Sequence, residues 1–133
     1  MSDQTITTLI EKLEGAEVGS NRLSDEVLSA CGYAETRFPM DSCTYWVHPS
    51  APKSPLSVAQ ESVTTSLDAA LALAERFWPG QEYEITTLYG VARVTLNMNH
   101  GDQAGPHYGH NDCGHVPSAI CAAILRAQSD ARV

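Results

Sequence analysis

Histidine and cysteine side chains gather in one stretch of this 133-residue chain. Four of its five histidines and one of its four cysteines lie between residues 100 and 115. Among them, His107, His110, Cys113 and His115 offer imidazole and thiolate groups, the usual ligands of zinc. Structural zinc sites, however, usually combine one close pair of ligands with a second pair far along the chain, whereas these four share one glycine-rich stretch. We therefore expect no bound metal and no cofactor.

The same stretch supplies an alternative function, a zinc-dependent hydrolase built on residues 100–115. A cysteine nucleophile such as Cys113 would also need a base, a setting that stabilises the thiolate, and an oxyanion hole. No local signature of such a site is present, and the chain has no G-x-S-x-G, no Walker loop and no G-x-G-x-x-G motif. The expectation is that the protein is not an enzyme.

A second group of side chains combines aromatic rings, one arginine and polar residues near the ends of expected strands. An arginine can hold a phosphate through two hydrogen bonds, and a flat aromatic ring can stack on a base. The candidate ligand-binding residues of this group are Trp46, Arg93, Asn97, His100 and Tyr108. The alternative interpretation is structural: Arg93 pairs with Glu82 or Glu84 across a hairpin, and the aromatic rings pack as strand aromatics commonly do.

Periodic apolar residues predict the helices that must position these groups. The first helix carries Ile6, Leu9, Ile10 and Leu13 at the spacing of one helical face. A second, short helix begins near Ser20 or Asn21 and ends at Gly32, a suitable C-terminal cap. The last helix begins near Pro117, which suits a first turn. Its expected face consists of Ile120, Ala123, Ile124 and Ala127.

The stretch 65–80, TSLDAALALAERFWPG, predicts the most clearly bounded helix. Thr65 and Ser66 are suitable N-cap residues, and Pro79-Gly80 ends the helix. The residues at the spacing of one face are Leu67, Ala70, Leu71 and Ala74, widened by Leu73 and Phe77. We expect the rest of the chain to be organised around this helix, with Leu71 buried against a sheet.

Strand patterns occupy the spaces between the helices. Thr44–His48 is rich in aromatic and β-branched residues, and 81–88 and 91–98 form an antiparallel hairpin around Tyr89-Gly90. We expect 33–39 to be irregular and 99–116 to be a loop. The order of elements predicts one α/β domain spanning residues 1–133. Its expected fold is a three-layer α-β-α sandwich, with helices on both faces of a small mixed or antiparallel sheet.

Composition restricts the classes of partner. Sixteen acidic and eight basic residues give a net charge of −8, and the basic residues are scattered, so generic nucleic-acid binding is not expected. No apolar run is long enough for a transmembrane helix, and the N-terminal residues do not form a secretory signal. We expect no membrane partner, a cytoplasmic location, and free thiols at the four cysteines.

Three segments carry a resemblance to a known family. They are TTLIEKLEGAEVGSNRLSDEVLSACGY, the helical stretch TSLDAALALAERFWPG with the hairpin that follows it, and GHVPSAICAAILRAQ. Together they cover most of the chain, and they resemble the small phage proteins called phage ABA-sandwich domains. The resemblance implies an α-β-α sandwich encoded by a phage or prophage. It brings no established activity and no catalytic residues.

From the residues and the resemblance together we expect a phage-encoded accessory protein that works by binding. Its partner would be a nucleotide-type small molecule, sequestered to counteract a host defence signal, or a host protein that it blocks. It would act in the host cell cytoplasm. The sequence leaves open whether the chain forms a homo-oligomer.

Overall fold

The computed structural model describes residues 3–38, 43–49, 55–56, 61–80, 82–98 and 105–130. The described helices are α1 (Asp3–Gly15), α2 (Asn21–Ala30), α4 (Leu67–Phe77) and α5 (Val116–Asp130). The described strands are β1 (Ala34–Phe38), β2 (Cys43–Val47), β3 (Glu82–Leu88), β4 (Val91–Met98) and β5 (Gly105–Asn111). The α/β class is therefore confirmed. No helix within these ranges is long and apolar enough to span a bilayer.

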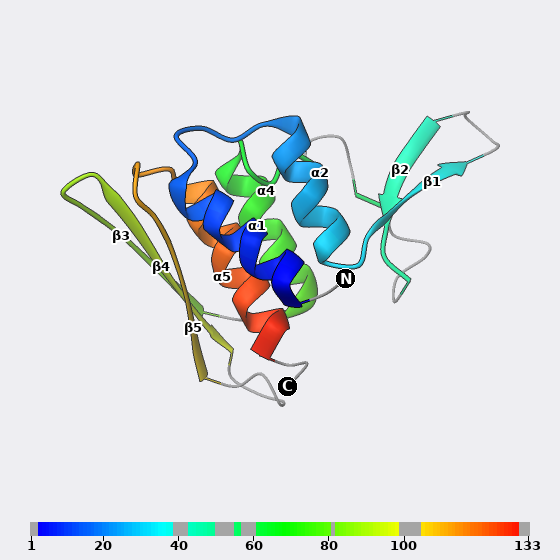
Figure 1. Cartoon of the computed structure of the whole chain (residues 1–133). Helices are drawn as coiled ribbons and strands as arrows, with labels where there is room; N and C mark the ends of the chain where they lie inside the picture. The colour runs from blue at the N-terminus through cyan, green and yellow to red at the C-terminus, as the bar shows by residue number, and fades with distance from the viewer. Residues whose placement is uncertain are drawn as a thin grey trace.

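All described strand pairs are antiparallel. β1 and β2 form a two-stranded sheet, and a separate three-stranded sheet has the order β3-β4-β5. The helices lie together between the two sheets, so the three-stranded sheet is covered by helices on one face (Figure 1). Its other face is exposed in the described residues. The small antiparallel sheet and the α/β sandwich agree with the sequence-based expectation, but within the described ranges helices cover only one face of that sheet, not both as expected.

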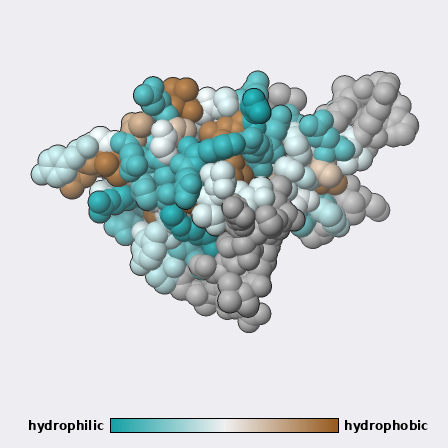
Figure 2. Space-filling model, in the orientation of Figure 1, coloured by the Kyte–Doolittle hydropathy of each residue, from teal (hydrophilic) through white to brown (hydrophobic). Residues whose placement is uncertain are grey.

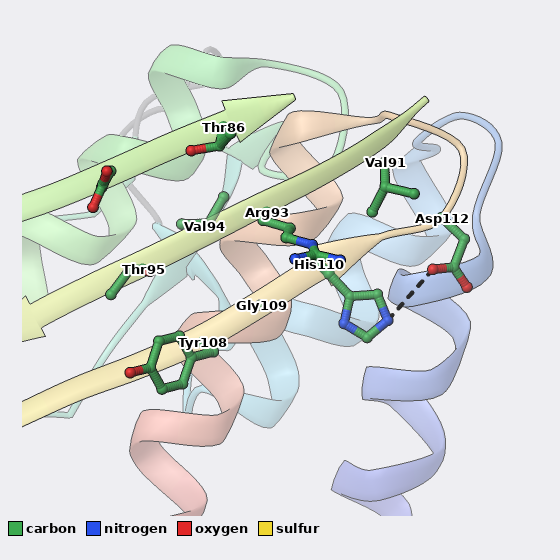
Figure 3. A pocket seen from close by; sticks show the side chains of 10 residues that line it. Thr86, Val91, Arg93, Val94, Thr95, Tyr108, Gly109, His110 and Asp112 are labelled. Atoms are coloured by element: carbon green, nitrogen blue, oxygen red, sulfur yellow. Dashed lines mark ion pairs between the residues drawn. The ribbon is translucent and has the colours of Figure 1, made fainter. Parts of the chain in front are cut away.

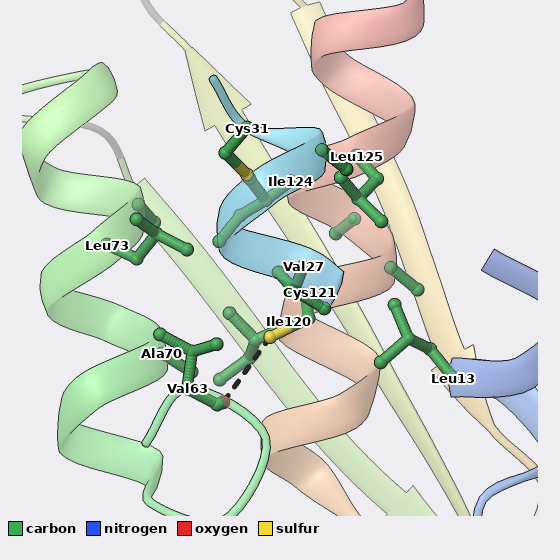
Figure 4. Close-up of a cluster of buried hydrophobic side chains, with 14 of the residues drawn as sticks. Leu13, Val27, Cys31, Val63, Ala70, Leu73, Ile120, Cys121, Ile124 and Leu125 are labelled. Atoms are coloured by element: carbon green, nitrogen blue, oxygen red, sulfur yellow. Dashed lines mark hydrogen bonds between the residues drawn. The ribbon is translucent and has the colours of Figure 1, made fainter. Parts of the chain in front are cut away.

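Helix α5 is the central element of the core. Every side chain from Pro117 to Leu125 is buried, because α5 packs on β4 and β5 on one side and on α1, α2 and α4 on the others. A helix that is apolar around its whole circumference requires such an environment. Figure 4 shows Ile120, Ile124 and Leu125 among side chains from the neighbouring helices. The expectation that residues 65–80 organise the chain was therefore wrong, since α5 has that position.

The first two helices follow the sequence pattern. The predicted face of α1 is buried, with Leu13 fully inaccessible. Helix α2 begins after Ser20, whose side chain accepts a hydrogen bond from the Leu23 backbone N–H at 3.0 Å. Gly32 follows it with φ +95°, a left-handed conformation that glycine adopts without strain. Both helix ends are thus set by the residue types at them.

Helix α4 has a different buried face from the one predicted. Its N-cap is Ser66, which accepts a hydrogen bond from the Ala69 backbone N–H at 3.2 Å. The buried side chains are Ala69, Ala70, Leu73 and Ala74. Leu71 is only half-buried, and Leu67 is 42% exposed, so the prediction that Leu71 is buried against a sheet was wrong. The physical reason is that α4 packs against α5, and its alanines allow that close approach.

The β3–β4 hairpin was predicted correctly and two other strands were not. Its turn has positive φ at both central residues, Tyr89 (53°) and Gly90 (76°), as the type I′ turn of a two-residue hairpin requires. By contrast, Ala34–Phe38 forms β1 where irregular chain was expected. The expected loop 99–116 contains β5, which pairs with β4 along the strand's whole length.

Candidate functional site

The exposed face of the three-stranded sheet, here called the outer face, carries two adjacent rows of polar and aromatic side chains. Residues directly opposite one another in antiparallel strands share a face. One row joins Thr86, Arg93 and His110 across the three strands. The next row joins Glu84, Thr95 and Tyr108. The outer face therefore brings a cation, an aromatic ring and carboxylates together.

The two rows line a shallow hollow of about 630 Å³. Figure 3 shows side chains of all three strands around it. Arg93 comes from the central strand β4, and Tyr108 lies on β5, two residues from His110. A smaller hollow of about 320 Å³ adjoins it at the other end of the sheet and is lined in part by Asn97. Tyr108 is 59% exposed, so its ring is accessible to a ligand.

Arg93 is exposed and forms neither an ion pair nor a hydrogen bond with any part of the chain that the structure describes. The pairing register explains why the expected ion pair is absent. Glu84 lies opposite Thr95, and Glu82 lies opposite Asn97, so neither carboxylate is directly across from Arg93. The structural alternative for Arg93 is therefore not realised within the described residues, and its guanidinium is available to bind an anion.

A charged network borders the outer face where β5 meets the helices. The His110 ring lies 3.1 Å from a Glu14 carboxylate oxygen through Nδ1 and 3.5 Å from Asp112 through Nε2. The same Glu14 oxygen accepts a hydrogen bond from Arg126 at 2.6 Å, and Arg126 also donates to the Tyr108 carbonyl at 3.1 Å. These contacts tie α1 and α5 to β5 and fix the strand that carries Tyr108.

Asn111 is a buried polar residue that sequence reasoning missed. Its side-chain amide donates to the carbonyls of Leu13 at 2.7 Å and Ala16 at 2.8 Å. Its side-chain oxygen accepts from the backbone N–H groups of Cys113 and His115, both at 2.9 Å. Asn111 thus joins the end of α1 to the turn before α5. The Asn-Asp-x-Gly composition of 111–114 indicates a turn, but it does not indicate the partners from α1.

The structure brings together three of the five predicted ligand-binding residues. Arg93, Asn97 and Tyr108 lie on the outer face. Trp46 lies on β2, half-buried against the core on the opposite side of the helices (Figure 1), so its predicted place beside Arg93 was wrong. The reason is that β2 pairs with β1 in a separate sheet. His100 lies outside the described residues.

The candidate metal ligands diverge. His107 is buried on the face of β5 that meets the helices, whereas His110 is on the outer face. His115 hydrogen-bonds through Nε2 to the Thr64 carbonyl at 2.6 Å, and Cys113 is exposed. Within the ranges described above, no group of three or more histidine, cysteine, aspartate or glutamate side chains is placed to hold a metal ion. The geometry thus gives the hydrolase alternative no ligand set from these four residues.

The cysteines differ in accessibility. Cys31, Cys113 and Cys121 form no disulfide, and the Cys43 side chain lies outside the described part of the structure. Burial raises the pKa of the Cys121 thiol well above its ordinary value, and this thiol donates a hydrogen bond to the Val63 carbonyl at 3.3 Å (Figure 4). A thiol held protonated in the core is a packing element, because the thiolate is the reactive form.

Comparison with known proteins adds no relative from which a function could be transferred. Models of protein families give no match to the chain, and neither the curated proteins nor the solved structures contain a match.

Proposed function

We propose that the protein is a non-enzymatic binding protein and that its outer face takes a nucleotide-type small molecule. The observation that carries this proposal is the state of Arg93. A guanidinium that is exposed, unpaired among the described residues and set in a hollow is ready to hold a phosphate through two hydrogen bonds.

The spacing of the two rows suits a ligand with an anionic end and a flat end. Residues two apart along a strand are separated by about 7 Å, so Arg93 lies one such step from the row that contains Tyr108. A phosphate on Arg93 would leave the base within reach of the Tyr108 ring, where stacking is favourable. Glu84 and Thr95, in the same row as Tyr108, can accept hydrogen bonds from ribose hydroxyls or base amino groups.

The resemblance to phage ABA-sandwich proteins supports a biological role for such binding. A phage-encoded protein that sequesters a nucleotide signal in the host cytoplasm would weaken the host response that depends on that signal. Blocking a host protein is the second candidate role. The exposed Tyr108 and the net charge of −8 favour it, because tyrosine is enriched at interfaces and acid excess attracts a basic partner.

A thermal-shift screen tests nucleotide binding. Purified protein would be melted with mononucleotides, cyclic nucleotides and ADP-ribose-type compounds, because a ligand at one hundred times its Kd stabilises a protein by about 2.7 kcal/mol. We expect at least one compound to raise the melting temperature. Arg93→Ala and Tyr108→Ala should abolish the shift while leaving the circular dichroism spectrum unchanged. Arg22→Ala, at an exposed position of α2, is the matched control and should keep the shift.

Two results would contradict the nucleotide proposal. One is a wild-type melting temperature that no compound changes. The other is a shift that survives both outer-face substitutions, which would place the ligand elsewhere. The first result would give the host-protein role precedence, and the second would remove the outer face as the nucleotide site. The hydrolase alternative is tested separately by elemental analysis for zinc.

A further inference from the structure

Strand β3 is an edge strand with little cover. The helices pack on β4 and β5, while β3 contacts mainly β4. Of its seven residues only Ile85 is partly buried, and the other six side chains are exposed. A seven-residue edge with both faces accessible is a ready template for pairing with another strand. The edge is therefore the strongest unassigned surface of the described structure.

The backbone groups on the free edge of β3 are those of Tyr83, Ile85 and Thr87. In a two-residue hairpin the residues that flank the turn hydrogen-bond to each other, and every second residue along the strand repeats this inward orientation. Leu88, which flanks the turn, thus points its N–H and C=O groups toward β4. The three intervening residues point theirs outward, and no bond from these groups to another described residue is found.

We propose that two copies of this chain pair through β3, antiparallel and centred on Ile85, to form one continuous six-stranded sheet. Centring on Ile85 is the only register that pairs all seven residues of Glu82–Leu88, because Ile85 is the middle residue. It also sets the outward backbone groups of one copy against those of the other. Ile85 faces Ile85 of the second copy, and Tyr83 faces Thr87 of the second copy.

The charges of β3 favour this register. With Ile85 at the centre, Glu84 faces Thr86 of the second copy and Glu82 faces Leu88 of the second copy, so no two carboxylates are opposed. A shift of the centre to Glu84 would place the two Glu84 side chains directly opposite, which is destabilising. A shift of the centre toward the turn, to Thr86 or Thr87, also leaves no carboxylates opposed, but it pairs fewer of the seven residues. The register centred on Ile85 therefore combines full pairing with unopposed carboxylates, which argues for a second copy over an unrelated strand.

Exposed apolar side chains accompany the free edge. Tyr83 is 51% exposed, Leu88 61% and Tyr89 94%, and Figure 2 shows apolar atoms at the projecting end of the hairpin. The two-fold axis of such a pair is perpendicular to the sheet, so both helix layers lie on the same side. The face of β3 turned toward the helices is largely uncovered, with Ile85 alone partly buried, which leaves space above β3 between the two helix layers.

The test measures the mass of the protein in solution by light scattering and analytical ultracentrifugation, without nucleotide. At about 100 µM chain, where a micromolar affinity keeps most copies paired, we expect twice the 14.3 kDa of one chain. Thr86→Glu should give single chains, because it sets two carboxylates opposite each other on both sides of the central Ile85 pair. Within one copy this position faces Arg93, so the folded monomer is not harmed.

A charge reversal and a matched control make the test specific. Adding Glu84→Lys to Thr86→Glu creates opposite charges across the proposed interface and should restore the dimer. Thr36→Glu, the same change at an exposed threonine of β1, should leave the dimer intact. A wild-type protein of single-chain mass at this concentration would overturn the proposal. So would a dimer that persists in Thr86→Glu, or one that Thr36→Glu also dissociates.

Discussion

The inner and outer faces of the three-stranded sheet come from the same strands but differ in composition and exposure. Along β4 the inward side chains Ala92, Val94 and Leu96 are at most 1% exposed, while the outward side chains Arg93, Thr95 and Asn97 are polar and at least partly accessible. The alternation follows from the two-residue period of a strand. Alternation thus assigns packing and binding to different side chains. The inner side chains pack against the helices, and the outer side chains remain available to a ligand.

Along β5, too, one set of residues faces outward and the other faces the helices. His110 projects outward, whereas Gly109 faces the helices and brings the strand backbone against α5. A Cβ atom built at Gly109 would lie 2.1 Å from the Ala119 carbonyl oxygen and 2.6 Å from the Ala123 backbone nitrogen. These are backbone atoms of a buried helix, so neither can move away cheaply. The strand and the helix thus fit only because position 109 has no side chain.

The largest effect is therefore expected at Gly109. Gly109→Ala must displace α5 or separate β5 from β4, and we expect a loss of about 4 kcal/mol or more in the free energy of unfolding. Urea denaturation followed by circular dichroism measures it. Gly15→Ala is the matched control, because a Cβ atom there meets nothing within 4 Å. An equally small effect for both substitutions would show that β5 does not pack on α5 as described.

The second effect concerns Leu96, which is fully buried on the inner face. Leu96→Ala removes three buried carbon atoms, Cγ and the two methyl groups, and leaves a cavity, so we expect a cost of about 2–5 kcal/mol. Its neighbour Asn97 points to the outer face, and Asn97→Ala should change stability by less than about 0.5 kcal/mol. Both variants would be unfolded in urea at one protein concentration, since dimerisation would make stability depend on it. Equal costs at the two positions would refute the assignment of faces.

The elements that could be predicted from the sequence are those whose local pattern agrees with their surroundings. The apolar spacing of α1 predicted its buried face, since α1 has one polar side and one covered side. Ser20 and Gly32 predicted the ends of α2 through their own backbone chemistry. Alternation and the Tyr89-Gly90 turn predicted the β3–β4 hairpin.

The remaining elements depend on tertiary contacts that no local pattern records. Strand β5, GPHYGHN, has few apolar residues and is held by pairing with β4 and by the close approach of α5 to Gly109. The apolar residues of α4 surround too much of the helix to indicate a single face. The candidate site was predicted in part: Arg93, Asn97 and Tyr108 were named from the chemistry of their side chains. Arg93 and Asn97 share a face because they are an even number of residues apart in one strand. The separation of Trp46 into another sheet depends on β1, whose residues are mostly polar.

The smallest expected effect on stability is at Arg93. It allows the outer and inner faces to be compared at two adjacent residues of one strand. Arg93→Ala should change the free energy of unfolding by less than about 0.5 kcal/mol, because an exposed side chain without a partner among the described residues contributes little to the fold. The adjacent Val94, 1% exposed on the inner face, provides the comparison in the same strand. Val94→Ala should be clearly destabilising under identical conditions. A loss above about 1 kcal/mol for Arg93→Ala would mean that the guanidinium is engaged in holding the fold. The outer face would then lose the free cation on which nucleotide binding depends, whatever the thermal-shift screen had shown for the wild type.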